Sequence, residues 1–135
     1  MSSTKSGKAK GRRLQNWVRD KLMAWLELTD DDIKCALMGE GGADIKLISD
    51  KAREVFPFDI ECKNAEAINV WKAYEQAASH GDLEPLLFIK KNGKKSLAVV
   101  DAEFFIKYTG ILAASLATLE AASIPIGPRI GGGYD

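Results

Sequence analysis

The sequence predicts an α/β fold in which a mixed central sheet carries helices on its faces. Residues 58–63 alternate apolar and charged side chains with the period of a half-buried strand. Two apolar runs, 85–89 and 96–100, flank a polar segment that contains Asn-Gly, which is a strong signal for a β-hairpin. Residues 11–28 place apolar residues at steps of three and four, the spacing of an amphipathic helix.

These patterns, taken in order, give alternating helices and strands. We expect helices over 11–28, 49–55, 65–79, 102–108 and 111–122, and strands over 33–38, 44–48, 58–63, 85–89 and 96–100. Ser49, Asn64 and Asp101 are the predicted N-caps, because their side chains accept backbone N–H groups at helix starts. Gly81 is expected just after the helix 65–79, as a left-handed C-terminal residue.

Apolar positions predict which helix faces are buried. On the helix 65–79, we expect Ile68, Trp71, Tyr74 and Ala78 to face the core. Trp17 and Trp25 fall on the apolar stripe of the first helix, so all three tryptophans are predicted to be core residues rather than platforms for stacking bases.

Length and composition favour one folded domain. At 135 residues the chain can bury a core, and we expect a disordered basic arm over 1–9, a domain over 10–122 and a flexible tail over 123–135. Net charge is zero, but residues 1–21 hold seven lysines and arginines against one aspartate. A polyanion responds to this local charge, since screening acts over about 8 Å at physiological ionic strength.

Cysteine and histidine usage argues against a structural zinc site and against a disulfide scaffold. The chain has two cysteines, Cys35 and Cys62, no CxxC and one histidine. Buried free thiols suit a reducing compartment, which predicts a cytoplasmic protein. We find no apolar run of 18 residues and no apolar segment near the amino end, so no membrane span and no secretory signal are expected.

The strand 58–63 carries the first candidate site. It puts Asp59, Glu61 and Lys63 on the face opposite its apolar residues, and Asp44 opens the preceding strand. Two carboxylates from adjacent strands and the Cys62 carbonyl can ligate Mg²⁺, and a nearby lysine can orient or deprotonate a bound water. The alternative is an ordinary ion-paired strand face, because acid-x-Lys triplets also occur at 32–34 and 44–46.

The order of these features resembles the PD-(D/E)xK nuclease superfamily, and within it the archaeal-type and related phage Holliday junction resolvases. The matching pieces are Lys10-Gly11 with Gln15 in the first helix, Asp44, Glu61-Cys62-Lys63, and the hairpin with its following helix. They cover about residues 10–108. The resemblance implies a restriction-endonuclease-like αβββαβ core.

The resemblance also implies a function. It predicts a DNA endonuclease dependent on Mg²⁺, with Mn²⁺ as a substitute, that hydrolyses phosphodiesters at branched DNA, in the cytoplasm of a prokaryotic or phage-infected cell. Asp44, Glu61, Lys63 and Gln15 would form the catalytic set, and Asp44, Glu61 and Cys62 the metal site. Symmetric cutting of a junction needs two sites, so a homodimer is expected, with the last helix and tail as candidate interface.

One departure leaves alternatives open. Resolvases of this type carry a glutamate where this chain has Gln15, and Asp59 or Glu40 is a candidate for the missing charge. Two alternatives to a junction-selective nuclease stay open. One is a nuclease of the same superfamily without junction preference, and the other is a non-catalytic DNA-binding module. The segment Gly39–Gly42 is either a flexible turn or a close approach to the DNA backbone.

Basic and polar side chains supply the candidate DNA contacts. Lysines and arginines of the amino-terminal helix and the hairpin tip suit phosphate contacts, and a polar stripe on the helix 65–79 is either a solvated face or the border of the site. The set is Lys10, Arg12, Arg13, Arg19, Lys72, Gln76, Lys90, Lys91, Lys94 and Lys95. His80 is expected near a helix C-terminus, without a chemical role.

Overall fold

The computed structural model describes residues 4–122 and confirms a mixed α/β fold. Its elements, in chain order, are α1 (Thr4–Leu26), β1 (Ile33–Cys35), β2 (Ile45–Leu47), α2 (Asp50–Val55), β3 (Phe58–Asn64), α3 (Val70–Ala78), β4 (Glu84–Lys90), β5 (Leu97–Val99) and α4 (Ala102–Ala121). This is the order of helices and strands that the sequence predicts, except that one helix replaces the last two, and β1, β2 and β5 are shorter than expected.

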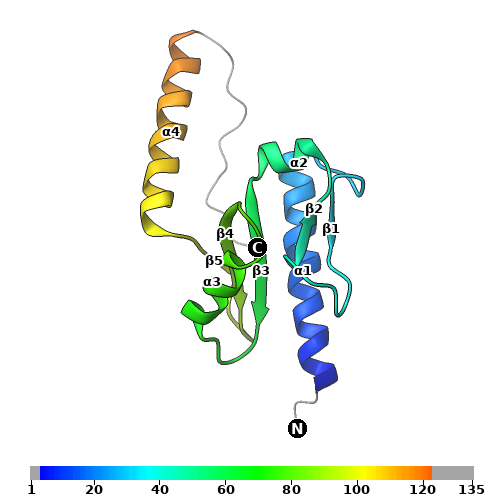
Figure 1. Cartoon of the computed structure of the whole chain (residues 1–135). Helices are drawn as coiled ribbons and strands as arrows, with labels where there is room; N and C mark the ends of the chain where they lie inside the picture. The colour runs from blue at the N-terminus through cyan, green and yellow to red at the C-terminus, as the bar shows by residue number, and fades with distance from the viewer. Residues whose placement is uncertain (1–3, 123–135) are drawn as a thin grey trace. The chain divides into compact units, whose positions relative to one another are not determined.

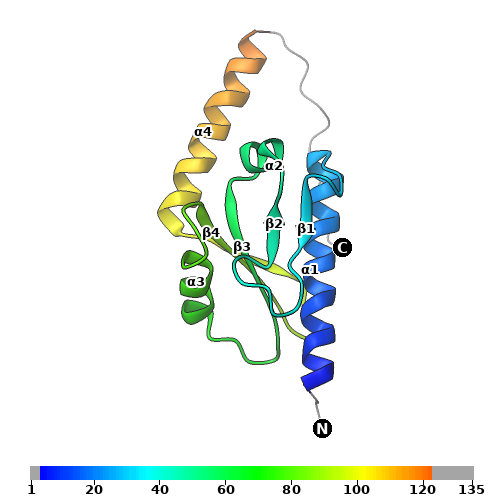
Figure 2. The ribbon, with the colours of Figure 1, turned by 45° about the vertical axis from the view of Figure 1, so that its right-hand side comes forward.

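The five strands form one sheet in the order β1-β2-β3-β4-β5, with β3 and β4 parallel and the other pairs antiparallel. Figures 1 and 2 show α1 running along one side of the sheet and α3 lying on the other side. The central strand β3 is therefore covered on both faces. The fully buried side chains centre on it and on its neighbours: Val18, Ile33, Ile45, Ile60 and Leu87.

The chain divides into two compact units, Met1–Val99 and Val100–Asp135. The first contains the whole sheet, and the described part of the second is α4. We predicted two helices here, over 102–108 and 111–122, but α4 is continuous, capped by Asp101, whose side chain accepts the N–H of Phe104 at 2.8 Å. The predicted tail 123–135 lies outside the described residues.

Helix α4 bears on the expectation about membranes. With 20 residues and a mean hydropathy of 1.2, it is long and apolar enough to cross a membrane, judged by length and composition only. The expectation that the chain has no membrane span stays a prediction.

Helix α1 begins earlier than predicted. It starts at Thr4 rather than at residue 11, so the expectation of disorder over residues 1–9 is wrong from Thr4 onward. Its buried side is narrow, with Leu14 and Val18 almost inaccessible, while Trp17 is 39% and Trp25 64% exposed. The tryptophans of α1 are thus not core residues, because the sheet contacts only the centre of the apolar stripe.

Helix α3 differs most from its prediction. It begins at Val70 with Asn69 as N-cap, which accepts the N–H of Lys72 at 3.1 Å. The predicted cap, Asn64, instead ends β3. The buried residues are Ala73 and Ala77, whereas Trp71 is 81% exposed. Small residues let the helix lie close to the sheet, and this close approach turns the large aromatic side chain outward.

The cap of α2 follows the prediction, and the end of α3 does not. Ser49 accepts the N–H of Ala52 at 3.0 Å. Gly81 has no positive φ; a Cβ added there would lie 2.9 Å from the Oδ2 of Asp59. A side chain at this position would displace the Asp59 carboxylate, which accepts the Leu83 N–H at 3.1 Å.

Candidate active site

Asp44 lies where β2 and β3 stop pairing. The register between these strands consists of Ile45 opposite Ile60. Asp44 directly precedes β2; its N–H donates to the Ile60 carbonyl at 2.9 Å, and its Oδ2 accepts the Cys62 N–H at 2.8 Å. The carboxylate therefore takes the position of a backbone acceptor at the end of the ladder, held between two strands.

Glu61 occupies the centre of β3 and is almost inaccessible, at 2% exposure. We predicted a solvated face for Asp59, Glu61 and Lys63, and at Glu61 this prediction is wrong. The reason is the cover that follows α3, where His80 places its Nε2 2.9 Å from the Oε2 of Glu61. The backbone N–H of His80 donates to the Ala77 carbonyl, so this histidine does lie at the C-terminal end of α3, as expected.

Burial and the neighbouring carboxylate together make Glu61 hard to ionise. Burial, a side-chain hydrogen bond with Asp44 and the charge of Asp44 raise the pKa of Glu61 from 4.5 to about 8, while the charge of Lys63 opposes the rise. Asp44, Glu61 and Lys63 are thus close enough to interact, as the sequence predicted. Two carboxylates that repel each other in this way gain when a cation lies between them.

The backbone of Cys62 offers a further oxygen near Asp44 and Glu61. Its N–H points toward β2, where it meets Asp44. In a β-strand the N–H and C=O of one residue point to the same side, so the Cys62 carbonyl also points toward β2, beyond the Ile45–Ile60 pair. The Cys62 side chain is buried, and burial raises the pKa of its thiol, which keeps the sulfur protonated and unsuited as a ligand.

Gln15 reaches the site from α1. It lines a cavity of about 250 Å³ together with Asp44, Arg12, Lys8 and Glu40. The structure therefore brings together the first-helix residue and the β2 carboxylate that the sequence paired. The side chain at this position is a neutral amide, so it adds hydrogen-bonding capacity without charge.

Glu40 and Asp59 are the candidates to supply the carboxylate that is missing at Gln15, and neither can bind a metal there without rearrangement. Glu40 lines the Gln15 cavity, but its carboxylate accepts the Leu37 N–H at 2.8 Å and pairs with Lys46 at 3.7 Å. Its pKa is lowered, chiefly by the hydrogen bond from Leu37. Asp59 accepts the Leu83 N–H at 3.1 Å, and burial raises its pKa.

The chemistry of the donors fits a divalent cation with hard oxygen ligands. Asp44 and Glu61 offer carboxylate oxygens, and Cys62 offers a carbonyl oxygen. Within residues 4–122 no group of three or more histidine, cysteine, aspartate or glutamate side chains is placed to hold a metal. A metal here would therefore depend on two carboxylates, one backbone oxygen and water, a set that suits Mg²⁺, which keeps several waters when bound.

The predicted DNA contacts fall into separate groups. Arg12 joins the Gln15 cavity, and the four hairpin lysines line a second cavity. Lys10 lies 3.9 Å from Glu66, which also accepts the Asn92 N–H, so α1 and the hairpin tip meet at one glutamate. Arg19 donates to Asp20 at 2.9 Å. The remaining three, which are exposed, are Arg13, Lys72 and Gln76.

Sequence reasoning missed the contact between Glu61 and His80. The signal available was the single histidine directly after a helix that returns to the strand bearing Glu61. Sequence separation alone does not show that the end of α3 lies over the middle of β3, because that depends on the parallel crossover from β3 to β4.

Comparison with protein-family models, with curated proteins and with solved structures found no match. The resemblance to the PD-(D/E)xK nucleases therefore rests on the residues described above and stays a prediction.

Proposed function

We propose that the chain is a metal-dependent DNA endonuclease that hydrolyses phosphodiester bonds. The observation that carries the proposal is the interaction of Asp44, Glu61 and Lys63 at the end of the β2–β3 ladder, with the Glu61 pKa raised to about 8 in part by Asp44. Two carboxylates this close repel each other when both are charged, and a bound cation would remove that repulsion, which is why the pair supports a cation site.

Each residue has a role in this proposal. Asp44, Glu61 and the Cys62 carbonyl hold Mg²⁺, which when bound supplies positive charge to the phosphate and lowers the pKa of water. Lys63 orients the attacking water or accepts its proton, and places positive charge beside the phosphate. Gln15 holds a water or a phosphate oxygen across the cavity it shares with Asp44.

The test is DNA cleavage in Mg²⁺ and in Mn²⁺ by the wild type, Glu61→Gln and Lys63→Ala. We expect loss of at least about 100-fold in rate for either variant, the usual effect of removing a catalytic acid, base or charge. Lys34→Ala is the matched control, because Asp32-Ile33-Lys34 is another acid-x-Lys triplet of this chain with an exposed lysine. Cleavage by Lys63→Ala at the wild-type rate would sink the site assignment.

Branched DNA is the proposed substrate, and this finer statement rests on the resemblance to resolvases. A competition between a four-way junction and a linear duplex of the same sequence measures it. Preferential cutting of the junction is expected, and equal cutting would leave a nuclease without junction preference.

Gln15 favours a second candidate, a DNA-binding module without catalysis, because a neutral amide stands where a charged ligand is expected. Gln15→Glu separates the two. If the wild type binds DNA but cuts none in either metal, the module is the better description; an increase in rate for Gln15→Glu shows a site that is active but short of one charge.

A further inference from the structure

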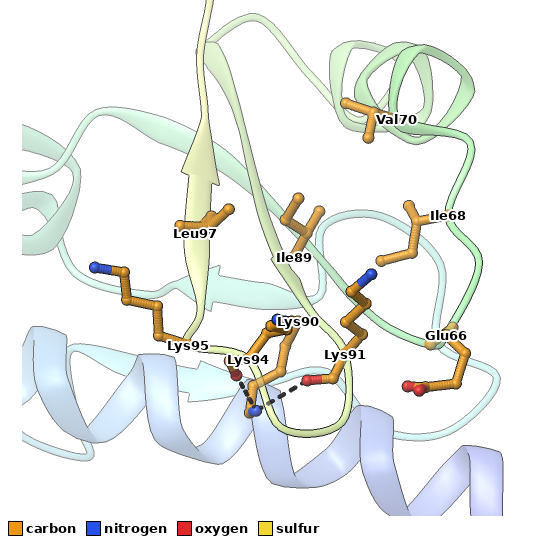
Figure 3. Close-up of a pocket in the computed structure, with 10 residues that line it drawn as sticks. Glu66, Ile68, Val70, Ile89, Lys90, Lys91, Lys94, Lys95 and Leu97 are labelled. Carbon is orange, nitrogen blue, oxygen red and sulfur yellow. Dashed lines mark hydrogen bonds between the residues drawn. The ribbon is translucent and has the colours of Figure 1, made fainter.

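The second cavity combines an apolar floor with a basic rim. It measures about 550 Å³ and lies between the β4–β5 hairpin and the segment that enters α3. Ile68, Val70, Ile89 and Leu97 provide apolar surface, and Leu97 is 52% exposed. Figure 3 shows these side chains together, with the lysines below them along the hairpin tip. The lysines are Lys90, Lys91, Lys94 and Lys95.

The lysines of this rim do not all have the same role. The Lys90 ammonium donates to the carbonyls of Lys91 and Lys94, which holds the turn closed (Figure 3). Lys91 and Lys94 are exposed at the rim. Glu66, the acidic lining residue, accepts the Asn92 N–H at 2.8 Å and pairs with Lys10. The rim therefore presents positive charge over a floor that water does not solvate well.

The register of the sheet connects this cavity to the candidate active site. Lys63 of β3 lies opposite Ile89 of β4, and Ile89 lies opposite Leu97 of β5. Residues opposite each other in neighbouring strands project from the same face. Lys63, Ile89 and Leu97 thus form a row across three strands, about 4.8 Å apart. A nucleic-acid strand with a phosphate at Lys63 that follows this row passes over the apolar floor.

We propose that this cavity binds an unstacked nucleobase of the DNA strand that crosses the active site, with the flanking phosphates on Lys91 and Lys94. This inference rests on the proposed DNA substrate and adds a site for an unpaired nucleotide. Charge complementarity selects a polyanion, and the apolar floor selects a polyanion that carries flat apolar groups, which is the chemistry of a single strand. Phosphate contacts alone would not require four apolar side chains beside the lysines.

The test uses the full chain in EDTA, so that no cleavage is involved. The probes are a fluorescein-labelled twelve-nucleotide oligothymidine and a strand of the same length with abasic sites in place of the bases. We expect the thymidine strand to bind at least about fivefold more tightly, the lower end of the range for one base stacked on an aromatic side chain, because this floor is aliphatic. Leu97→Ser and Ile68→Ser should each reduce this ratio toward one while leaving the affinity for the abasic strand unchanged.

Controls separate the floor from the rim and from the fold. Val55→Ser removes a comparably exposed apolar side chain of α2, 43% exposed, and should change neither affinity. Lys91→Gln with Lys94→Gln should weaken both probes. Ile68 lies outside the sheet, so its variant remains informative if Leu97→Ser disturbs β5.

Two results would overturn the inference: equal binding of the two strands by the wild type, or a base preference that neither floor variant reduces. Cleavage is measured separately. Base-dependent binding without cleavage in Mg²⁺ would contradict the proposed nuclease activity and keep the cavity, whereas cleavage without base-dependent binding would contradict the cavity alone.

Discussion

Glu61 is the residue on which the proposed chemistry depends, and its side chain is buried beneath a small number of neighbouring side chains. His80 covers its Oε2, Asp44 approaches from β2, and Lys63 follows two positions along the strand. A carboxyl in this setting is costly to ionise, because burial removes water and Asp44 adds negative charge. This cost of ionisation is absent when the side chain at position 61 is neutral. Variants of Glu61 and of His80 therefore test the arrangement.

Glu61→Gln should stabilise the metal-free protein at pH 8. The folded-state pKa is raised from 4.5 to about 8, so the folded protein keeps a proton that the unfolded chain has lost. The stabilisation from protonated Glu61 is complete below about pH 4.5 and is lost as the pH rises through 8. Urea unfolding in EDTA should show a gain of about 1 kcal/mol or more for Glu61→Gln at pH 8, and little gain at pH 4. Glu75→Gln, at an exposed position of α3, is the control. A loss of stability for Glu61→Gln at pH 8 would contradict the proposed repulsion.

His80→Ala should destabilise the protein by about 1–3 kcal/mol, since it leaves a buried carboxyl oxygen without its partner. His80→Gln should recover part of this loss, because an amide can still meet the Glu61 oxygen. Urea unfolding at pH 6 measures both variants. Equal losses for the two would indicate that packing, rather than the hydrogen bond, accounts for the role of His80.

At the scale of elements, the site is built by the way β3 is enclosed. It pairs with β2 through a single register pair and with β4 over its whole length, from Phe58 opposite Glu84 to Asn64 opposite Lys90. The long parallel pairing fixes Lys63 beside Ile89, and the short antiparallel pairing frees the Asp44 carboxylate to meet Cys62. The crossover through α3 then returns the chain over the same face.

Gly81→Ala should destabilise the protein by about 1–3 kcal/mol, because the added Cβ would lie 2.9 Å from Asp59 Oδ2, so that either the crossover shifts or Asp59 gives up its hydrogen bond with the Leu83 N–H. Gly11→Ala in α1 should instead stabilise the protein, because no atom lies within 4 Å of the new Cβ and alanine favours the helix by up to about 1 kcal/mol. Thermal unfolding of the two variants compares them directly. A neutral Gly81→Ala would mean that Asp59 moves aside without cost.

At the scale of the whole molecule, the core belongs to the unit Met1–Val99. Among the described residues, every buried apolar side chain lies between Leu14 and Leu87. Helix α4 contributes none of them, although it is more apolar than α1 and α3. The predicted homodimer, with α4 as its candidate interface, stays a prediction that the following truncation addresses.

Removal of residues 101–135 should leave a cooperatively folded protein, with a change in unfolding free energy below about 1 kcal/mol per monomer. If α4 forms the dimer, light scattering should give a dimer for the full chain and a monomer for the truncated one. A truncated dimer would place the interface on the sheet unit, and loss of cooperative unfolding would show that α4 belongs to the folded core.

The sequence by itself determined the order of helices and strands, the hairpin, the caps at Ser49 and Asp101, and the association of Asp44, Glu61 and Lys63. These follow from local periodicity, turn chemistry and the alternation of a strand, which act over a few residues. The tertiary structure decided which faces are covered. It buried Glu61 under His80, set Ala73 and Ala77 inward, and left Trp71 outside. Whether a side chain is buried depends on which distant element packs against its face. Here the β3–α3–β4 crossover decides this, and it brings together residues too far apart in the sequence for local patterns to relate.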